Sequence, residues 1–178
     1  WKAPVLQGDR GLSQKGPAIG NASYYYSQTR LQSTGTVEVG GDQIEVSGLS
    51  WMDHEFSTSA LAADQVGWDW FSLQMDDGSE LMVFQLRKTN GSIDPYSSGT
   101  LVEADGTVRY LRRDDSRIVS EATWRSPRSG AVYPALWQVE VPSLKLTLQI
   151  KPYLADQEWN VSYVYWEGAV SCTGQRGE

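Results

Sequence analysis

Hydrophobic and polar residues alternate with a period of two along most of the chain. The clearest case is Ser143 to Ile150, in which every even-numbered residue is apolar and every odd-numbered residue is polar. Such alternation predicts a β-strand with one buried face. Similar patterns predict further strands at Ser23 to Leu31, Gly48 to Phe56, Trp68 to Leu73, Tyr133 to Val141 and Val161 to Val170.

Three glycine-containing turns separate pairs of these alternating segments. The hairpins run from Thr36 to Val46, from Leu73 to Phe84 and from Thr100 to Leu111, and each tight turn suits the positive φ that glycine adopts readily. Only Ser57 to Val66 has a helical pattern, which ends at Gly67. The sequence therefore predicts an all-β, antiparallel barrel or sandwich with one short helix, and a domain junction or a lid near residues 57 to 66.

The composition narrows the classes of function. The chain of 178 residues has 8 Trp and 9 Tyr but only 3 Phe, so most of its aromatic rings carry a polar N–H or O–H group. A net charge of -7 argues against a nucleic-acid partner, and no apolar run is long enough to cross a membrane as a helix. One His and one Cys do not suffice for a structural zinc site or an internal disulfide. Neither a phosphate-binding glycine loop nor a Gly-x-Ser-x-Gly motif is present, so we expect no cofactor and no serine hydrolase.

His54 is the only histidine, and it lies between two carboxylates. In a strand, His54 shares one face with Met52 and Phe56, whereas the opposite face carries Trp51 and Glu55. The apolar neighbours of His54 predict that its ring points into an interior. There it is either an acid, base or hydrogen-bond donor for a ligand, or a core histidine that a backbone carbonyl satisfies.

Asp69 is a second candidate for chemistry. Alternation places Asp69 on the face of Phe71 and Leu73, with Trp68 and Trp70 on the opposite face. A carboxyl group directed into an apolar interior can remain protonated and act as a general acid. Alternatively, Asp69 accepts a hydrogen bond from an indole or a backbone amide and has only a structural role.

Several strings of the sequence closely resemble the carotenoid 1,2-hydratase family, also called AttH-like and often labelled predicted secreted hydrolase. These strings are LQGDRGLSQKG, NASYYYSQTRL, VSGLSWMDHEF, GWDWFSLQMDDGSELMVFQLR, and DQE followed by YWEGAV. The resemblance implies two lipocalin-like β-barrels, a periplasmic, secreted or membrane-associated location, and an apolar small molecule as partner. Members of the family are longer, so the resemblance implies a fragment. Residues 1 to 58 would complete an N-terminal barrel, and residues 59 to 178 would form a C-terminal barrel that lacks its last strand.

The resemblance also implies a reaction. Carotenoid hydratases add water to an isoprenoid or polyene double bond without a redox cofactor, by protonation of the alkene and capture of the cation by water. Aromatic faces stabilise such a cation. On this hypothesis Asp69 is the acid and His54 its partner or the base that positions water. The substrate would lie against Trp51, Trp68, Trp70, Tyr26 and Glu55. Two alternatives stay open: a polyene cyclase that acts through the shape of its pocket, and a carrier of an apolar ligand that needs no acid.

Overall fold

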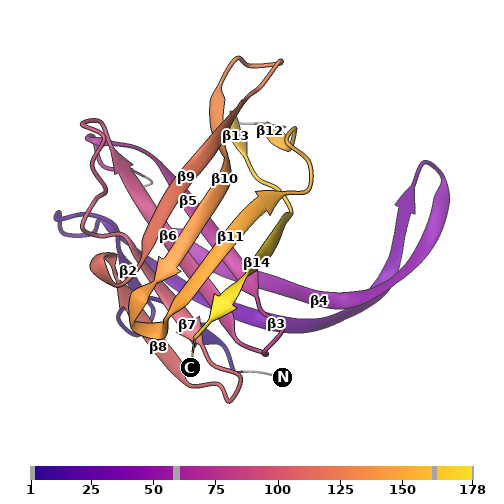
Figure 1. The fold of residues 1–178 in the computed structure, drawn as a ribbon, viewed down its shortest axis with the longest axis horizontal. Coiled ribbons are helices and arrows are strands. Elements are labelled where there is room, and N and C mark those ends of the chain that lie inside the picture. The colour runs from indigo at the N-terminus through magenta and orange to yellow at the C-terminus, as the bar shows by residue number, and fades with distance from the viewer. Residues whose placement is uncertain (1–2, 58–60, 162–163, 178) are drawn as a thin grey trace. The chain divides into compact units, whose positions relative to one another are not determined.

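The computed structural model describes residues 3–57, 61–161 and 164–177. The chain forms two compact units, Trp1–Arg113 and Asp114–Glu178. Within each unit the paired strands are antiparallel (Figure 1). Unit 1 contains the segment near residue 58 at which the sequence predicts a junction. The boundary between two lipocalin-like barrels at that point stays a prediction.

Unit 1 contains two four-stranded sheets. In the first sheet the long strand β3 pairs with β1, β2 and β4, and the second sheet is a meander in the order β5-β6-β7-β8. The strands of the first sheet are β1 (Val5–Leu6), β2 (Leu12–Gln14), β3 (Ala22–Val39) and β4 (Asp42–Ser57). Those of the second are β5 (Gln65–Gln74), β6 (Glu80–Lys88), β7 (Ser98–Val102) and β8 (Val108–Arg112).

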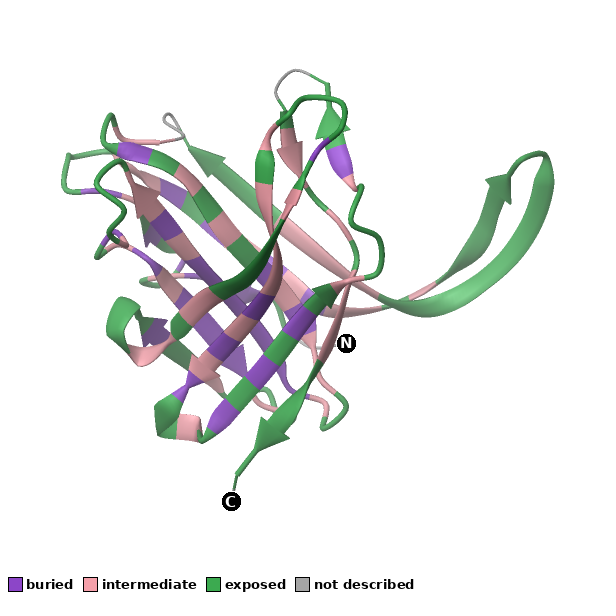
Figure 2. Ribbon diagram, turned by 45° about the horizontal axis from the view of Figure 1, so that its top comes forward, coloured by how far each residue is buried: buried purple, intermediate pink, exposed green. Residues whose placement is uncertain are grey.

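The three predicted hairpins are confirmed by the strand register. Strands β3 and β4 meet at the pair Val39↔Asp42 across two glycines, both with positive φ. The pairs Gln74↔Glu80 and Val102↔Val108 close the other two hairpins. The distal halves of β3 and β4 extend as a two-stranded arm with exposed residues on both faces (Figure 2).

Unit 2 is built on one four-stranded sheet and a short hairpin. The sheet has the order β14-β11-β10-β9, and β12 pairs with β13. Its strands are β9 (Arg117–Arg125), β10 (Val132–Val141), β11 (Leu146–Pro152) and β14 (Val170–Arg176), and the hairpin consists of β12 (Glu158–Asn160) and β13 (Val164–Trp166). The 3₁₀ turns η1 (Arg113–Asp115) and η2 (Pro142–Leu144) precede β9 and β11.

Three predicted elements differ from the structure. The helix expected over Ser57 to Val66 is wrong for its described part, because residues 61–64 form a turn and β5 begins at Gln65. The Ala62 N–H bonds the Gln65 side chain, and the Gln65 N–H bonds the Ala62 carbonyl, which closes a turn. Residues 58–60 of that prediction lie outside the described residues. The strand predicted from Ser143 begins only at Leu146, since η2 and a left-handed Lys145 come first.

The third difference is the strand predicted from Val161 to Val170, which is interrupted in its described part. Residues 162–163 of that prediction lie outside the described residues. Strand β13 ends at Trp166 and β14 begins at Val170. Between them, the Ala169 N–H donates to Gln157 Oε1, and the Gln157 side chain lies against Gly168 so closely that a Cβ there would clash. The backbone at Gly168 and Ala169 thus contacts the Gln157 side chain, so these residues do not extend β13 or β14.

In unit 1 the central strand β6 is buried on both faces, whereas in unit 2 alternate residues of β11 are buried. In unit 1, Leu81, Val83 and Leu101 are fully buried, and Val139 and Ile150 are fully buried in unit 2. The alternation of buried and exposed residues is visible along β11 in Figure 2. In the part of the chain that the structure describes, no helix has the length and apolar character needed to cross a membrane.

Candidate functional site

The inner face of the β3–β4 hairpin is unusually polar. The register aligns Tyr25 with Glu55 and Ser27 with Asp53, and these side chains share one face of the two strands. Tyr25 is only 2% exposed and belongs to a buried cluster with residues of β6, including Phe84. Polar and aromatic side chains of the first sheet therefore meet aromatic and apolar side chains of the second sheet.

A chain of hydrogen bonds crosses this interior. Gln7 Nε2 donates to Ser27 Oγ at 2.9 Å, and Ser27 Oγ donates to Asp53 Oδ1 at 2.5 Å. The Tyr25 hydroxyl also bonds Asp53 and accepts a bond from Trp70 Nε1 at 3.2 Å. Asp53 thus accepts hydrogen bonds from two hydroxyl groups, which is the environment of a carboxylate held in one orientation.

Lys15 enters the same interior just beyond the end of β2. Its Nζ lies 3.0 Å from Glu55 Oε1, and Ser23 Oγ donates to the same oxygen at 2.5 Å. The ammonium also lies over aromatic rings, 4.1 Å from the centroid of Phe84 and 5.6 Å from that of Tyr25. The Lys15 side chain is 15% exposed and that of Glu55 is 39% exposed, so the pair leads from the interior to solvent.

Two groups of this cluster have perturbed protonation. Burial lowers the pKa of Lys15, although the neighbouring Glu55 carboxylate partly opposes the shift. Burial also raises the pKa of the Tyr25 phenol, and the negative charge of Asp53 raises it further. Titratable groups that combine desolvation with a specific charged partner are typical of functional sites.

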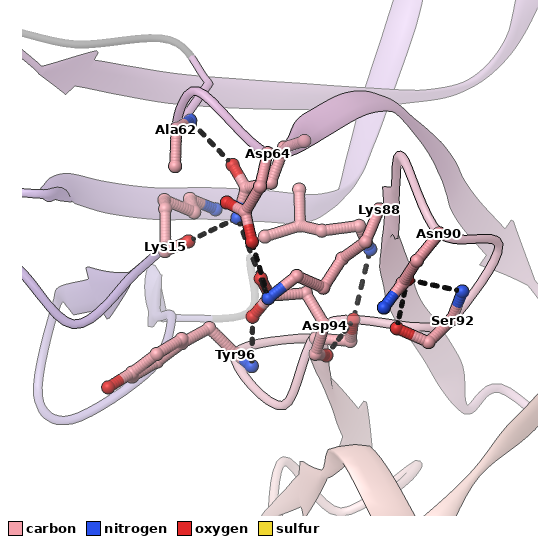
Figure 3. A network of polar contacts seen from close by, with 11 residues as sticks. Lys15, Ala62, Asp64, Lys88, Asn90, Ser92, Asp94 and Tyr96 are labelled. Atoms are coloured by element: carbon pink, nitrogen blue, oxygen red, sulfur yellow. Dashed lines mark hydrogen bonds and ion pairs between the residues drawn. The ribbon is translucent and has the colours of Figure 1, made fainter.

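A polar network fixes the segment before β5 next to Lys15 (Figure 3). Gln65 Nε2 donates to the Lys15 carbonyl at 2.8 Å and to Asp94 Oδ2 at 3.1 Å. Lys88 Nζ lies 2.6 Å from Asp64 Oδ2 and 3.7 Å from Asp94 Oδ2. The backbone that carries Lys15 is therefore tied to β5 and to the loop after β6.

Trp51 packs against the buried Tyr25 cluster, and its predicted contact with a substrate stays a prediction. Its Nε1 is buried and has no hydrogen-bond partner among the described residues, and the same is true of Gln7 Oε1. Buried polar atoms almost always have partners. This donor and this acceptor are therefore available to a bound polar group.

His54 and Tyr26 lie on the opposite, outer face of the hairpin. The prediction that His54 points into an interior is wrong, because the residue is exposed. Its ring stacks on Tyr26 with centroids 5.2 Å apart and approaches Phe56 edge-on at 5.3 Å. The inner face is instead the polar face, on which Asp53 and Glu55 find partners. The catalytic role of His54 stays a prediction.

Asp69 has the orientation that the sequence predicts. Its side chain is 9% exposed and shares a face of β5 with the buried Phe71. Its surroundings are less apolar than expected, since Gln85 Nε2 donates to Oδ2 at 2.9 Å and Arg87 Nε lies 3.4 Å from the same oxygen. The alternative of an indole partner is not realised among these contacts.

The predicted site residues therefore do not form one site. Trp68 and Trp70 lie on the other face of β5 from Asp69, and they are 47% and 38% exposed. Trp51, Trp70 and Glu55 contact or adjoin the Tyr25 cluster. The hypothesis that these indoles surround both His54 and Asp69 is thus wrong.

Sequence reasoning missed Lys15, Tyr25 and Asp53 as site residues. Lys15 follows a strand of only three residues, too short to give a periodic signal. Tyr25 and Asp53 could have been found by pairing the two predicted strands, because their neighbours on the inner face are complementary polar residues. In the described ranges no cluster of three His, Cys, Asp or Glu side chains is arranged to bind a metal ion.

Comparison with known proteins identifies the family of this chain. The AttH-like family model matches residues 1–178. A crystal structure of a protein assigned as AttH from Nitrosomonas europaea has a TM-score of 0.90 and 39% sequence identity, and the match covers 99% of this chain and 55% of that one. This agreement confirms the predicted antiparallel, lipocalin-like fold class.

Two further relatives carry the names of enzymes. Kievitone hydratase from Nectria haematococca matches with a TM-score of 0.76 at 16% identity, over 97% of this chain and 53% of that chain. Dehydratase asqC from Emericella nidulans is 22% identical over 169 residues, which are 86% of this chain and 44% of the relative. The chain thus spans about half the length of the relatives that it matches. Because the family model covers residues 1–178, the chain belongs to the AttH-like family.

Proposed function

We propose that this protein adds water to, or removes water from, an apolar small molecule at the cluster of Lys15, Tyr25, Asp53 and Glu55. The observation that carries the proposal is the pairing of two proton donors with two carboxylates beside aromatic rings. The names of the hydratase and dehydratase relatives support the same class of reaction.

Water addition and elimination need one group that gives a proton and one that takes it. In this cluster Lys15 and Tyr25 are the donors, and Glu55 and Asp53 are the acceptors. The rings of Trp51 and Phe84, with Trp70 bonded to Tyr25, supply apolar surface for the substrate, and the Trp51 N–H is available to a substrate oxygen. The resemblance to carotenoid hydratases suggests an isoprenoid or polyene chain as the apolar part.

Asp69 remains the proposed acid of a second arrangement, because its side chain is 9% exposed and lies on the opposite face of β5, with Gln85 and Arg87 as its polar partners. The two arrangements predict different effects of single substitutions. If the Lys15 cluster catalyses the reaction, Glu55→Gln lowers turnover by about 100-fold, the usual contribution of one general acid or base. The turnover of Asp69→Asn then stays close to that of the parent. The reverse result would assign the chemistry to Asp69.

The assay uses the natural full chain with the apolar ligand that copurifies with it. After incubation in D₂O, mass spectrometry detects gain or loss of one water, with deuterium on carbon. Asp105→Asn serves as the control, since this exposed carboxylate bonds only its own hairpin turn in the contacts described. Isomerisation without change of mass would favour a cyclase, and an unchanged ligand would favour a carrier. Either outcome would contradict the proposal.

A further inference from the structure

Lys15 is a largely buried cation that contacts both a carboxylate and an aromatic ring. Its amine is held between the Glu55 carboxylate at 3.0 Å and the Phe84 ring at 4.1 Å, with 15% of the side chain exposed. The contrast is Lys88, whose Nζ lies 2.6 Å from the half-exposed Asp64 carboxylate. Both lysines have carboxylate partners, but only Lys15 is also surrounded by aromatic side chains.

The backbone of Lys15 is fixed on both sides. Its N–H donates to the Asn21 carbonyl at 2.9 Å. Its carbonyl accepts from Gln65 Nε2 at 2.8 Å (Figure 3). The amine therefore keeps its place without a strand ladder around it. A reactive group that is held in place in this way does not have to be ordered when a ligand arrives.

We propose that Lys15 forms an imine with the carbonyl group of an apolar aldehyde or ketone. The inference deepens the proposed function, on which its second step rests, by naming the chemical class of the substrate. A desolvated lysine beside aromatic side chains is a suitable amine nucleophile, because less of it is protonated and its lone pair is available.

The reaction is balanced with the groups present. The Lys15 nitrogen attacks the carbonyl carbon, Glu55 accepts the proton that the ammonium must lose, and the carbonyl oxygen leaves as water when the C=N bond forms. Amine and carbonyl thus give imine and one water, without oxidant or reductant. The 39% exposure of Glu55 lets its proton pass to solvent or return to the departing oxygen.

An imine explains how weak acids support loss of water. Lysine and tyrosine are too weak as acids to protonate an isolated alkene, but a protonated imine makes the neighbouring C–H bond acidic. Glu55 removes that proton, the electron pair forms the new double bond, and the hydroxyl group one carbon further leaves with a proton as water. Hydrolysis of the imine then releases the unsaturated carbonyl product and restores Lys15. The substrate class is therefore a β-hydroxy aldehyde or ketone on an apolar chain.

The protonation of the surrounding groups agrees with this role. Lys15 is faced by Glu55 from β4 and by the Tyr25 ring from β3, with Phe84 of β6 as the apolar side. Asp53 bonds Tyr25 rather than Lys15 in the contacts described. Burial lowers the pKa of Lys15, whereas the ion pair with Asp64 raises the pKa of Lys88. One pKa unit changes the amount of free amine about tenfold. Lys15 should thus react faster than Lys88 at the same pH.

The test is reductive trapping on the natural full chain. The protein is incubated with octanal and cyanoborohydride, and peptide mass spectrometry measures the alkylation of each lysine. We expect Lys15 to be modified faster than Lys88, because burial lowers the pKa of Lys15 and the ion pair with Asp64 raises that of Lys88. In Lys15→Arg, which keeps the charge, this adduct should vanish while the Lys88 adduct stays. A polar aldehyde such as glyoxylate should show much less preference for Lys15.

Trapping separates this inference from the proposed function. If Lys15 is unmodified, or no faster than Lys88, the imine is refuted even when the protein still transfers water. If Lys15 is trapped but no water is gained or lost by any ligand, the carbonyl site stands and the hydratase proposal fails. Since Lys88 is measured in the same molecule, misfolding of a variant does not decide the result.

Discussion

Tyr25→Phe tests the hydrogen-bonded interior, because it removes a single buried oxygen. In the parent this oxygen bonds the Asp53 carboxylate and accepts from Trp70 Nε1 at 3.2 Å. The substitution keeps the aromatic ring, and the residue as a whole is 2% exposed. The substitution therefore measures the hydrogen bonds rather than loss of apolar packing.

The magnitude follows from the two bonds. A hydrogen bond to a charged group contributes about 1.5–3 kcal/mol, and a neutral bond about 1 kcal/mol. Trp70 is 38% exposed, so water can replace part of the second contribution. We expect the free energy of unfolding to fall by about 2–3 kcal/mol, which is a decrease of about 1 M in the urea midpoint for an ordinary m-value.

The assay is urea unfolding followed by tryptophan fluorescence and circular dichroism. Tyr110→Phe is the matched control, because its hydroxyl donates to the Leu6 carbonyl at 3.1 Å but the residue is 51% exposed. Its change should stay within about 0.5 kcal/mol. Combining Tyr25→Phe with Asp53→Asn should give less than the sum of the single effects, since both remove the same bond. Equal midpoints for Tyr25→Phe and Tyr110→Phe would refute the reasoning.

The remaining predictions concern protonation and backbone packing. Because burial lowers the pKa of Lys15 below 10.5, the folded state binds fewer protons than the unfolded state in the range just below pH 10.5. The contribution of Lys15 to stability is thus present above pH 10.5 and is lost as the pH falls through the folded pKa. Lys15→Met should flatten this pH dependence in urea unfolding, and an unchanged slope would contradict the assignment. Gly174→Ala should destabilise by about 2 kcal/mol or more, because a Cβ would lie 2.1 Å from the Thr147 carbonyl oxygen. Gly48→Ala meets no atom within 4 Å, so its melting temperature should be nearly that of the parent, and equal losses in both variants would count against this account.

Alternation predicted which residues share a face, but it did not always predict which face is inside. For β5, both the orientation of Asp69 and the opposite orientation of Trp70 follow from the sequence and agree with the structure. For β4, the more apolar face, with Phe56, is exposed. The face with Asp53 turns toward the interior, and Glu55 on the same face is 39% exposed. Apolar side chains lie on both faces of this strand, so hydropathy alone did not distinguish them.

The part of the site that the sequence did not predict depends on contacts between distant segments. Lys15 reaches Phe84 and Glu55 only because β2, β4 and β6 come together in unit 1. The spacing of these residues along the chain does not predict their contact. Likewise, the turn found before β5 depends on Gln65. Its side chain bonds Lys15, which lies earlier in the sequence, and Asp94, which lies later.

In a polar interior, the strand register rather than hydropathy determines which side chains meet. Ser27 lies opposite Asp53, and Tyr25 lies opposite Glu55, across one pair of strands. A slip of one residue would move each side chain to the other face and leave the buried hydroxyls without carboxylate partners. Apolar residues would tolerate such a slip better, because their packing has no donors and acceptors to match. The hydrogen bonds that make the site suitable for proton transfer therefore also select the one strand pairing in which that site exists.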